Sequence, residues 1–137
     1  MWRCAAQEAR GLDVIPTTIE RFRAGGDAES AALLEGAILA DEIKHVCIGL
    51  RWFRHCVARG RGEPACGEEV VCAEEVVCAA FHAIVRESWR GGTLKPPFNK
   101  EARARAGMSE AFYLPLSSAA AASSIDERGL ANAGVNA

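Results

Sequence analysis

The sequence predicts an all-α protein built as a helical bundle, and three observations support this. Half of the 137 residues are hydrophobic but only 7% are aromatic, so the core has to come from Ala, Leu, Ile and Val. One Tyr and five Pro argue against a β-sandwich. Residues 27–59 contain no Pro and only two Gly, at 36 and 49. A helix of that length is typical of bundles, and a chain of this size supports one modest domain.

Charge and hydropathy exclude two classes of partner. No run approaches the roughly 18 consecutive apolar residues that a membrane-spanning helix needs, so we expect no membrane. The formal net charge is −2 and no basic block stands out, so a strong nucleic-acid footprint is missing. The six cysteines come without an export signal and are expected to be reduced thiols. We therefore expect an intracellular, reducing compartment, which is either the cytoplasm or an organelle.

The N-terminal segment predicts two short helices. The first has no capping residue before its first turn, and Gly11 occupies the position of a glycine that ends a helix. After Pro16, Thr17 or Thr18 can cap a brief helix that runs to Arg23.

One long central helix is expected over residues 27–59, which is about 50 Å at 1.5 Å per residue. Asp27 opens it, and the Gly- and Pro-containing segment 60–64 stops it. Apolar residues at a 4-3-4-3-4 spacing predict its buried face. They are Leu39, Ile43, Val46, Leu50, Phe53 and Val57. A charged set predicts its solvent face: Asp41, Lys44, Arg51, His55 and Arg59.

A third row, about 100° from the apolar row, carries Glu42 and His45 between Ile38 and Trp52. The two polar residues lie three apart, one turn along the same side of the helix. Four-helix dinuclear iron and manganese proteins use Glu-x-x-His from two helices and a single Glu from each of two others. Carboxylates bridge the two metals there, and the imidazole adds a nitrogen ligand. The alternative is a borderline-exposed Glu and a hydrogen-bonded His on the flank of a bundle.

The second half of the chain predicts further helices. One runs from about Glu68 to Trp89 and includes a six-residue repeat that spaces three cysteines, Cys66, Cys72 and Cys78, six apart. That spacing suits neither the short Cys intervals of zinc sites nor one helix face, so a local duplication is the better interpretation. Residues 93–98 form an extended connection. Asn99 then caps a short helix, and Ser109 another that runs to Leu114. We divide the chain into a helical domain, 1–116, and a disordered Ala/Ser-rich tail, 117–137.

Three motifs in this order and spacing resemble a known family. They are Glu-Ala-Arg-Gly-Leu-Asp-Val at 8–14, Asp-Glu-Ile-Lys-His-Val at 41–46 with Arg-Trp-Phe at 51–53, and Leu-Lys-Pro-Pro-Phe-Asn at 94–99. The combination is similar to the ferritin-like family catalogued as domain of unknown function 455, and the resemblance covers roughly residues 5–113.

The resemblance implies a ferritin-like bundle with a dinuclear metal centre. Iron is the implied metal, and manganese is the alternative. Glu8 would be the lone carboxylate of one bundle helix, and Glu42 and His45 the Glu-x-x-His of the next. The functional analogues are di-iron oxygenases, including a tRNA-modifying hydroxylase, but fold analogy does not give a substrate.

The family pattern has an earlier helix pair, with another Glu and another Glu-x-x-His, before the segment that matches here. We therefore expect a truncated member that corresponds to the C-terminal half of the pattern. Two readings follow: an enzyme with oxidase or oxygenase chemistry, whose remaining ligands come from a homodimer or a missing-half partner, or a non-catalytic fragment without a metal. A third is an unrelated helical interaction module.

Overall fold

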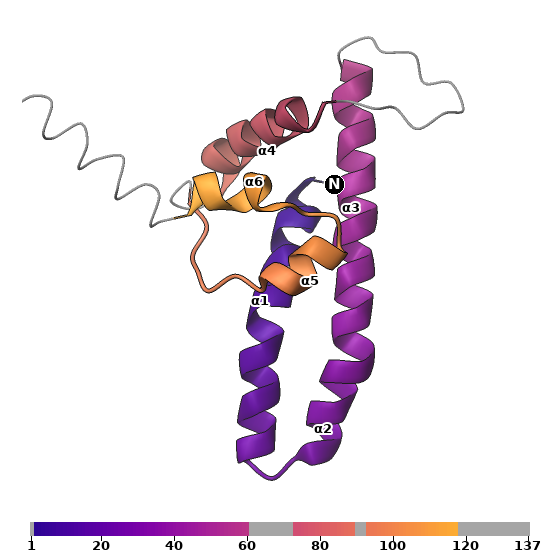
Figure 1. Cartoon of the computed structure of the whole chain (residues 1–137), viewed down its shortest axis with the longest axis vertical. Helices are drawn as coiled ribbons and strands as arrows, with labels where there is room; N and C mark the ends of the chain where they lie inside the picture. The colour runs from indigo at the N-terminus through magenta and orange to yellow at the C-terminus, as the bar shows by residue number, and fades with distance from the viewer. Residues whose placement is uncertain (1, 61–72, 90–92, 118–137) are drawn as a thin grey trace, which may run out of the picture.

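A computed structural model describes residues 2–60, 73–89 and 93–117, and within these ranges the chain is helical, without a β-strand (Figure 1). The all-α prediction is confirmed. No helix in the described part is long and apolar enough to cross a membrane. The helices, with η1 a π-helix and η2 a 3-10 helix, are α1 (Trp2–Ala24), α2 (Ala28–Leu33), η1 (Leu34–Ile38), α3 (Leu39–Gly60), α4 (Glu74–Ser88), α5 (Lys100–Arg105), α6 (Glu110–Tyr113) and η2 (Leu114–Leu116).

An antiparallel hairpin forms the long axis of the molecule (Figure 1). α1 makes one arm, and α2, η1 and α3 follow one another without a break to make the other. Asp27 begins the second arm as predicted, because its side chain accepts a hydrogen bond of 2.9 Å from the Ser30 backbone N–H.

The second arm differs from the expected uninterrupted α-helix at one place. Leu34–Ile38 form a π-helical turn, which holds one more residue per turn than an α-helix. Turns of this kind occur often beside functional sites. This one ends four residues before Glu42.

α1 continues through both positions where a break was expected, so the prediction of two short helices is wrong. Pro16 has no N–H to give to the carbonyl of Leu12, four residues earlier. The Asn99 side chain donates a hydrogen bond of 3.1 Å to that Leu12 carbonyl instead. Gly11 lies inside the helix, where an added Cβ would meet the Glu42 side chain of α3 at ordinary contact distance, as described below.

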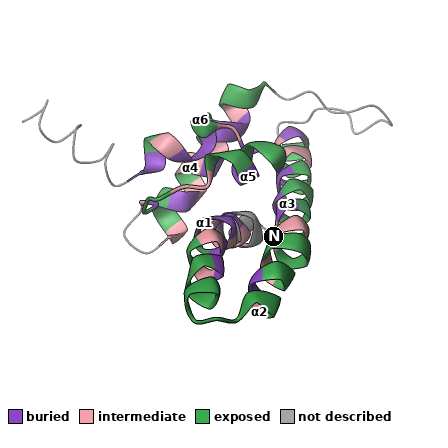
Figure 2. Cartoon of the chain, turned by 60° about the horizontal axis from the view of Figure 1, so that its bottom comes forward, coloured by how far each residue is buried: buried purple, intermediate pink, exposed green. Residues whose placement is uncertain are grey.

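The core lies where α4, α5 and α6 pack against one part of the hairpin (Figures 1 and 2). The predicted apolar row is confirmed: its four middle residues are buried, and Leu39 and Val57 are partly buried against them. Phe81 of α4 joins Phe53 and Phe112 by edge-to-face contacts, with ring centroids 5.8 and 5.5 Å apart. Residues 20–29, at the far end of the hairpin, are exposed.

A buried ion pair fixes α5 to α1. Arg103 donates two hydrogen bonds to Asp13, of 2.9 and 2.7 Å, and a third of 3.3 Å to the Ala9 carbonyl. The guanidinium also lies over the rings of Tyr113 and Phe98, at 4.5 and 5.1 Å from the centroids. No local sequence pattern predicts this ion pair, because Asp13 and Arg103 lie 90 residues apart.

The predicted element boundaries in the second half of the chain either differ from the structure or lie outside the residues that it describes. α4 begins at Glu74 after an extended Ala73, not at Glu68. Residues 61–72, including Cys66 and Cys72, lie outside the described ranges, as does the tail from 118 onward. Ser117 does not belong to a tail: it is buried and forms a parallel bridge with Leu94.

The predicted caps of the two short helices have different outcomes. Asn99 accepts a hydrogen bond of 3.1 Å from the Ala102 N–H and begins α5, as expected. Ser109 precedes α6, but its side chain makes no capping hydrogen bond there. Among the described cysteines, Cys47, Cys56 and Cys78 are free, and only Cys78 is buried.

Candidate metal centre

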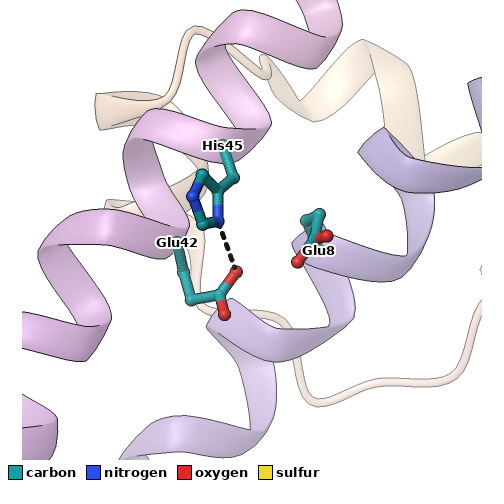
Figure 3. A group of neighbouring side chains, drawn as sticks. All are labelled: Glu8, Glu42 and His45. Atoms are coloured by element: carbon teal, nitrogen blue, oxygen red, sulfur yellow. Dashed lines mark ion pairs between the residues drawn. The ribbon is translucent and has the colours of Figure 1, made fainter. Parts of the chain in front are cut away.

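Packing of α1 against α3 brings Glu8, Glu42 and His45 together (Figure 3). Each offers one ligand atom, and these atoms all lie within 4.8 Å of one another. Within α3, His45 Nδ1 lies 3.6 Å from Glu42 Oε2. Glu8 reaches the pair from the other arm of the hairpin. The three residues named as ligands from sequence and resemblance thus form one group.

Gly11 makes room for this group. It follows Glu8 by one helical turn, and a Cβ added to it would lie 3.7 Å from Cδ and 3.8 Å from Oε2 of Glu42. A methyl group would fill this space at ordinary contact distance. Gly11 therefore keeps the space beside the Glu42 carboxylate free, and does not end the helix.

The Glu42 carboxyl is in an unfavourable electrostatic position. Its side chain is 24% exposed, and Oε2 is buried without a hydrogen-bond partner. Burial raises the pKa of Glu42 above the ordinary glutamate value; the neighbouring Glu8 carboxyl raises it further, and His45 opposes the shift. A buried carboxylate oxygen beside a second carboxyl, with His45 Nδ1 no closer than 3.6 Å, is costly unless a proton or a cation compensates it.

The donor set suits a divalent first-row metal. Two carboxylates and one imidazole provide hard oxygen ligands and one borderline nitrogen ligand, which iron and manganese accept. Three protein ligands leave positions open on an ion that prefers six. Within the described ranges, no other His, Cys, Asp or Glu joins the group.

The surface around the group is apolar and open to solvent. His45 has 57% of its side chain exposed. Ile38, Ile48 and Trp52 of the same arm are 39%, 54% and 52% exposed. The row that was expected to lie apart from the solvent face is therefore itself accessible.

The remaining histidines and a described cavity lie elsewhere. The His82 ring forms a hydrogen bond of 2.9 Å with the Ala111 carbonyl, and His55 packs edge-on against Trp52. A cavity of about 160 Å³ between α1 and residues 93–98 is lined in part by Arg10 and Trp89. None of the three candidate ligands borders it.

Comparison with known proteins identifies a family without a described activity. A family profile described as protein of unknown function, DUF455, matches residues 4–114. Neither the search of curated proteins nor the search of solved structures gave a match. The profile covers most of the chain and spans all three candidate ligands. The chain therefore belongs to the DUF455 family of proteins of unknown function.

Proposed function

We propose that this chain binds iron or manganese through Glu8, Glu42 and His45, as part of a carboxylate-bridged dinuclear centre in a ferritin-like bundle. The observation that carries the proposal is the group itself: three ligand atoms within 4.8 Å of one another, held by two packed helices. The buried Oε2 of Glu42, which has no hydrogen-bond partner and only the His45 contact at 3.6 Å, adds support, because a bound cation would compensate it.

The arrangement of the hairpin supports the ferritin-like part of the proposal. Dinuclear bundles take one Glu from one helix and Glu-x-x-His from its neighbour, and each half of the centre repeats this pattern. Here Glu8 of α1 faces Glu42 and His45 of α3. The apolar row of α3 packs into the core that α1, α4, α5 and α6 share.

The chemistry proposed is that of an oxidase or oxygenase. When bound, a carboxylate-bridged iron pair supplies dioxygen activation in this class of centre. The residues of this chain hold the metal: Glu42 and Glu8 contribute negative charge, and His45 contributes one nitrogen. Gly11 keeps the approach beside Glu42 free of a side chain.

A non-catalytic helical interaction module is the second candidate function. The exposed apolar side chains Ile38, Ile48 and Trp52 favour it, because apolar side chains exposed along one arm can pack against another protein. The two candidates differ in metal binding, which a direct measurement can decide.

The test is metal content per chain after anaerobic reconstitution with Fe(II), and separately with Mn(II), measured by elemental analysis on the monodisperse fraction. We expect about one metal per chain in the wild type and none above background in Glu42→Ala or His45→Ala. Asp41→Ala and His55→Ala are matched controls on the same helix and should retain the wild-type content. Equal metal content in Glu42→Ala and wild type would reject the ligand assignment.

A further inference from the structure

We infer that a second copy of this chain completes the metal centre, pairing α1 and α3 with their counterparts around a two-fold axis. This inference rests on the proposed function and names the partner of that site. The shared centre lies between two identical hairpins, each of which supplies three ligands.

The first support is the ligand count. A dinuclear bundle centre uses four carboxylates and two histidines, as two single Glu and two Glu-x-x-His motifs. The described residues provide one of each, Glu8 with the Glu42 and His45 pair. Two copies of this three-residue group would therefore match that ligand set. Designed dinuclear proteins place the same ligands in a four-helix bundle.

The second support is the symmetry of the apolar residues around the site. Ile38 and Trp52 lie seven residues before and seven residues after His45, which is two turns in each direction on the same side of the arm. A two-fold axis that crosses α3 at His45 brings Ile38 of one copy opposite the partner's Trp52. The interface is then self-complementary, as an isologous contact requires.

The third support is the exposure of this face. His45, Ile38 and Trp52 are each 39% exposed or more, whereas the apolar row of α3, about 100° round the helix, is covered by the rest of the chain. Burial of Trp52 against a second copy would remove apolar area from water and enclose His45 at the same time. It would also exclude water from the incompletely paired Glu42 carboxylate.

The test uses the full chain with Mn(II) as the probe. Mass by light scattering, manganese per chain and the electron paramagnetic resonance spectrum are recorded together. We expect Mn(II) to convert the chain to a dimer with two manganese ions and the spectrum of a spin-coupled pair. Trp52→Glu keeps all three ligands, and we expect it to stay monomeric and to bind manganese at least tenfold more weakly. Ala83→Glu, on the exposed side of α4, should behave as the wild type.

A second test introduces opposite charges at Ile38 and Trp52, so that the conclusion does not depend on Trp52→Glu alone. Ile38→Lys should disrupt the dimer as Trp52→Glu does. The double variant Ile38→Lys/Trp52→Glu should recover it, because the two introduced charges of opposite sign would face each other across the interface. Circular dichroism on each variant verifies the helical fold.

The possible outcomes separate the inference from the proposed function. One uncoupled manganese per monomer, unchanged by Trp52→Glu, would overturn the shared centre and leave metal binding by this chain intact. A dimer that forms equally without metal and in Glu42→Ala, with no manganese bound, would overturn both. No retention of manganese or iron by the wild type in any state would reject the proposed function, and the inference with it.

Discussion

Arg103 has only 3% of its side chain exposed and Asp13 only 1%, and each is the main charged partner of the other. Asp13 also accepts a hydrogen bond of 2.9 Å from the Asn99 backbone N–H. A pair buried this deeply contributes little net stability over an apolar replacement, but its loss on one side leaves an uncompensated charge. Replacing one of the two residues alone should therefore destabilise the fold far more than replacing both with apolar residues.

We predict that Arg103→Ala lowers the free energy of unfolding by about 3–5 kcal/mol. Asp13 would keep its charge without the guanidinium, and the rings of Phe98 and Tyr113 would lose the group stacked on them. Urea denaturation followed by circular dichroism measures the change. Arg105→Ala, exposed on the same helix, is the control and should change stability by less than about 0.5 kcal/mol. A similarly small effect for Arg103→Ala would show that the pair does not hold α5.

The raised pKa of Glu42 predicts that the stability of the metal-free chain depends on pH in an unusual way. Its pKa in the folded state lies above the ordinary glutamate value of 4.5, so the folded state binds this proton more tightly than the unfolded state does. The loss of folding stability that this shift causes is complete above the raised pKa and disappears as the pH falls toward 4.5. We expect Glu42→Gln to be stabilising at pH 7.5 and to lose that advantage near pH 4.5. Urea denaturation at each pH measures the change. The control Glu20→Gln, at an exposed position, should show no such trend. If the free energy of unfolding of Glu42→Gln and of the wild type changed with pH in parallel, the raised pKa of Glu42 would be contradicted.

At the scale of elements, the sequence predicted what periodicity and local capping determine. The apolar row of α3 repeats over several turns, so its buried face could be recognised without knowing what covers it. Asp27 and Asn99 act as caps within three residues of themselves. Glu42 and His45 were paired by spacing alone, whereas Glu8 came from the resemblance, because its distance from them depends on how the two arms pack.

The prediction of two short helices in place of α1 failed because contacts distant in sequence decide the outcome. Gly11 and Pro16 both indicate a helix end locally, yet each is accommodated by a residue distant in sequence. The Glu42 carboxylate lies beside Gly11, and Asn99 satisfies the carbonyl that Pro16 leaves unpaired. Neither contact can be predicted from the segment 1–24 itself.

A double-mutant cycle tests the link between Pro16 and Asn99. In the wild type, Asn99→Ala removes both the α5 cap and the donor to the Leu12 carbonyl, and we expect a loss of about 1–3 kcal/mol. Pro16→Ala restores the backbone N–H that can bond Leu12 within the helix. In that background Asn99→Ala should cost less, with a coupling of about 0.5–1.5 kcal/mol. Additive effects in urea denaturation would mean that the Leu12 carbonyl is satisfied in another way.

At the scale of the whole molecule, metal binding and assembly should be coupled in the stability of the chain. A ligand that binds only the folded state at a concentration 100-fold above its Kd adds about 2.7 kcal/mol to the free energy of unfolding. If two copies share the centre, the melting temperature with Mn(II) should also rise with chain concentration. Calorimetry at two concentrations, with and without Mn(II), measures both effects. His45→Ala should show neither, and a concentration-independent rise in the wild type would indicate a monomeric site.

The hydrogen bonds that hold α5 have a kinetic consequence. They join residues 86 to 94 positions apart, whereas the two arms of the hairpin meet through a short connection. Closing the longer loop costs more chain entropy, so we expect the hairpin to assemble first and α5 to dock in a later step. Arg103→Ala should then accelerate unfolding far more than it slows refolding. The candidate ligands, which all lie on the early hairpin, would be assembled before the rest of the domain closes over its core.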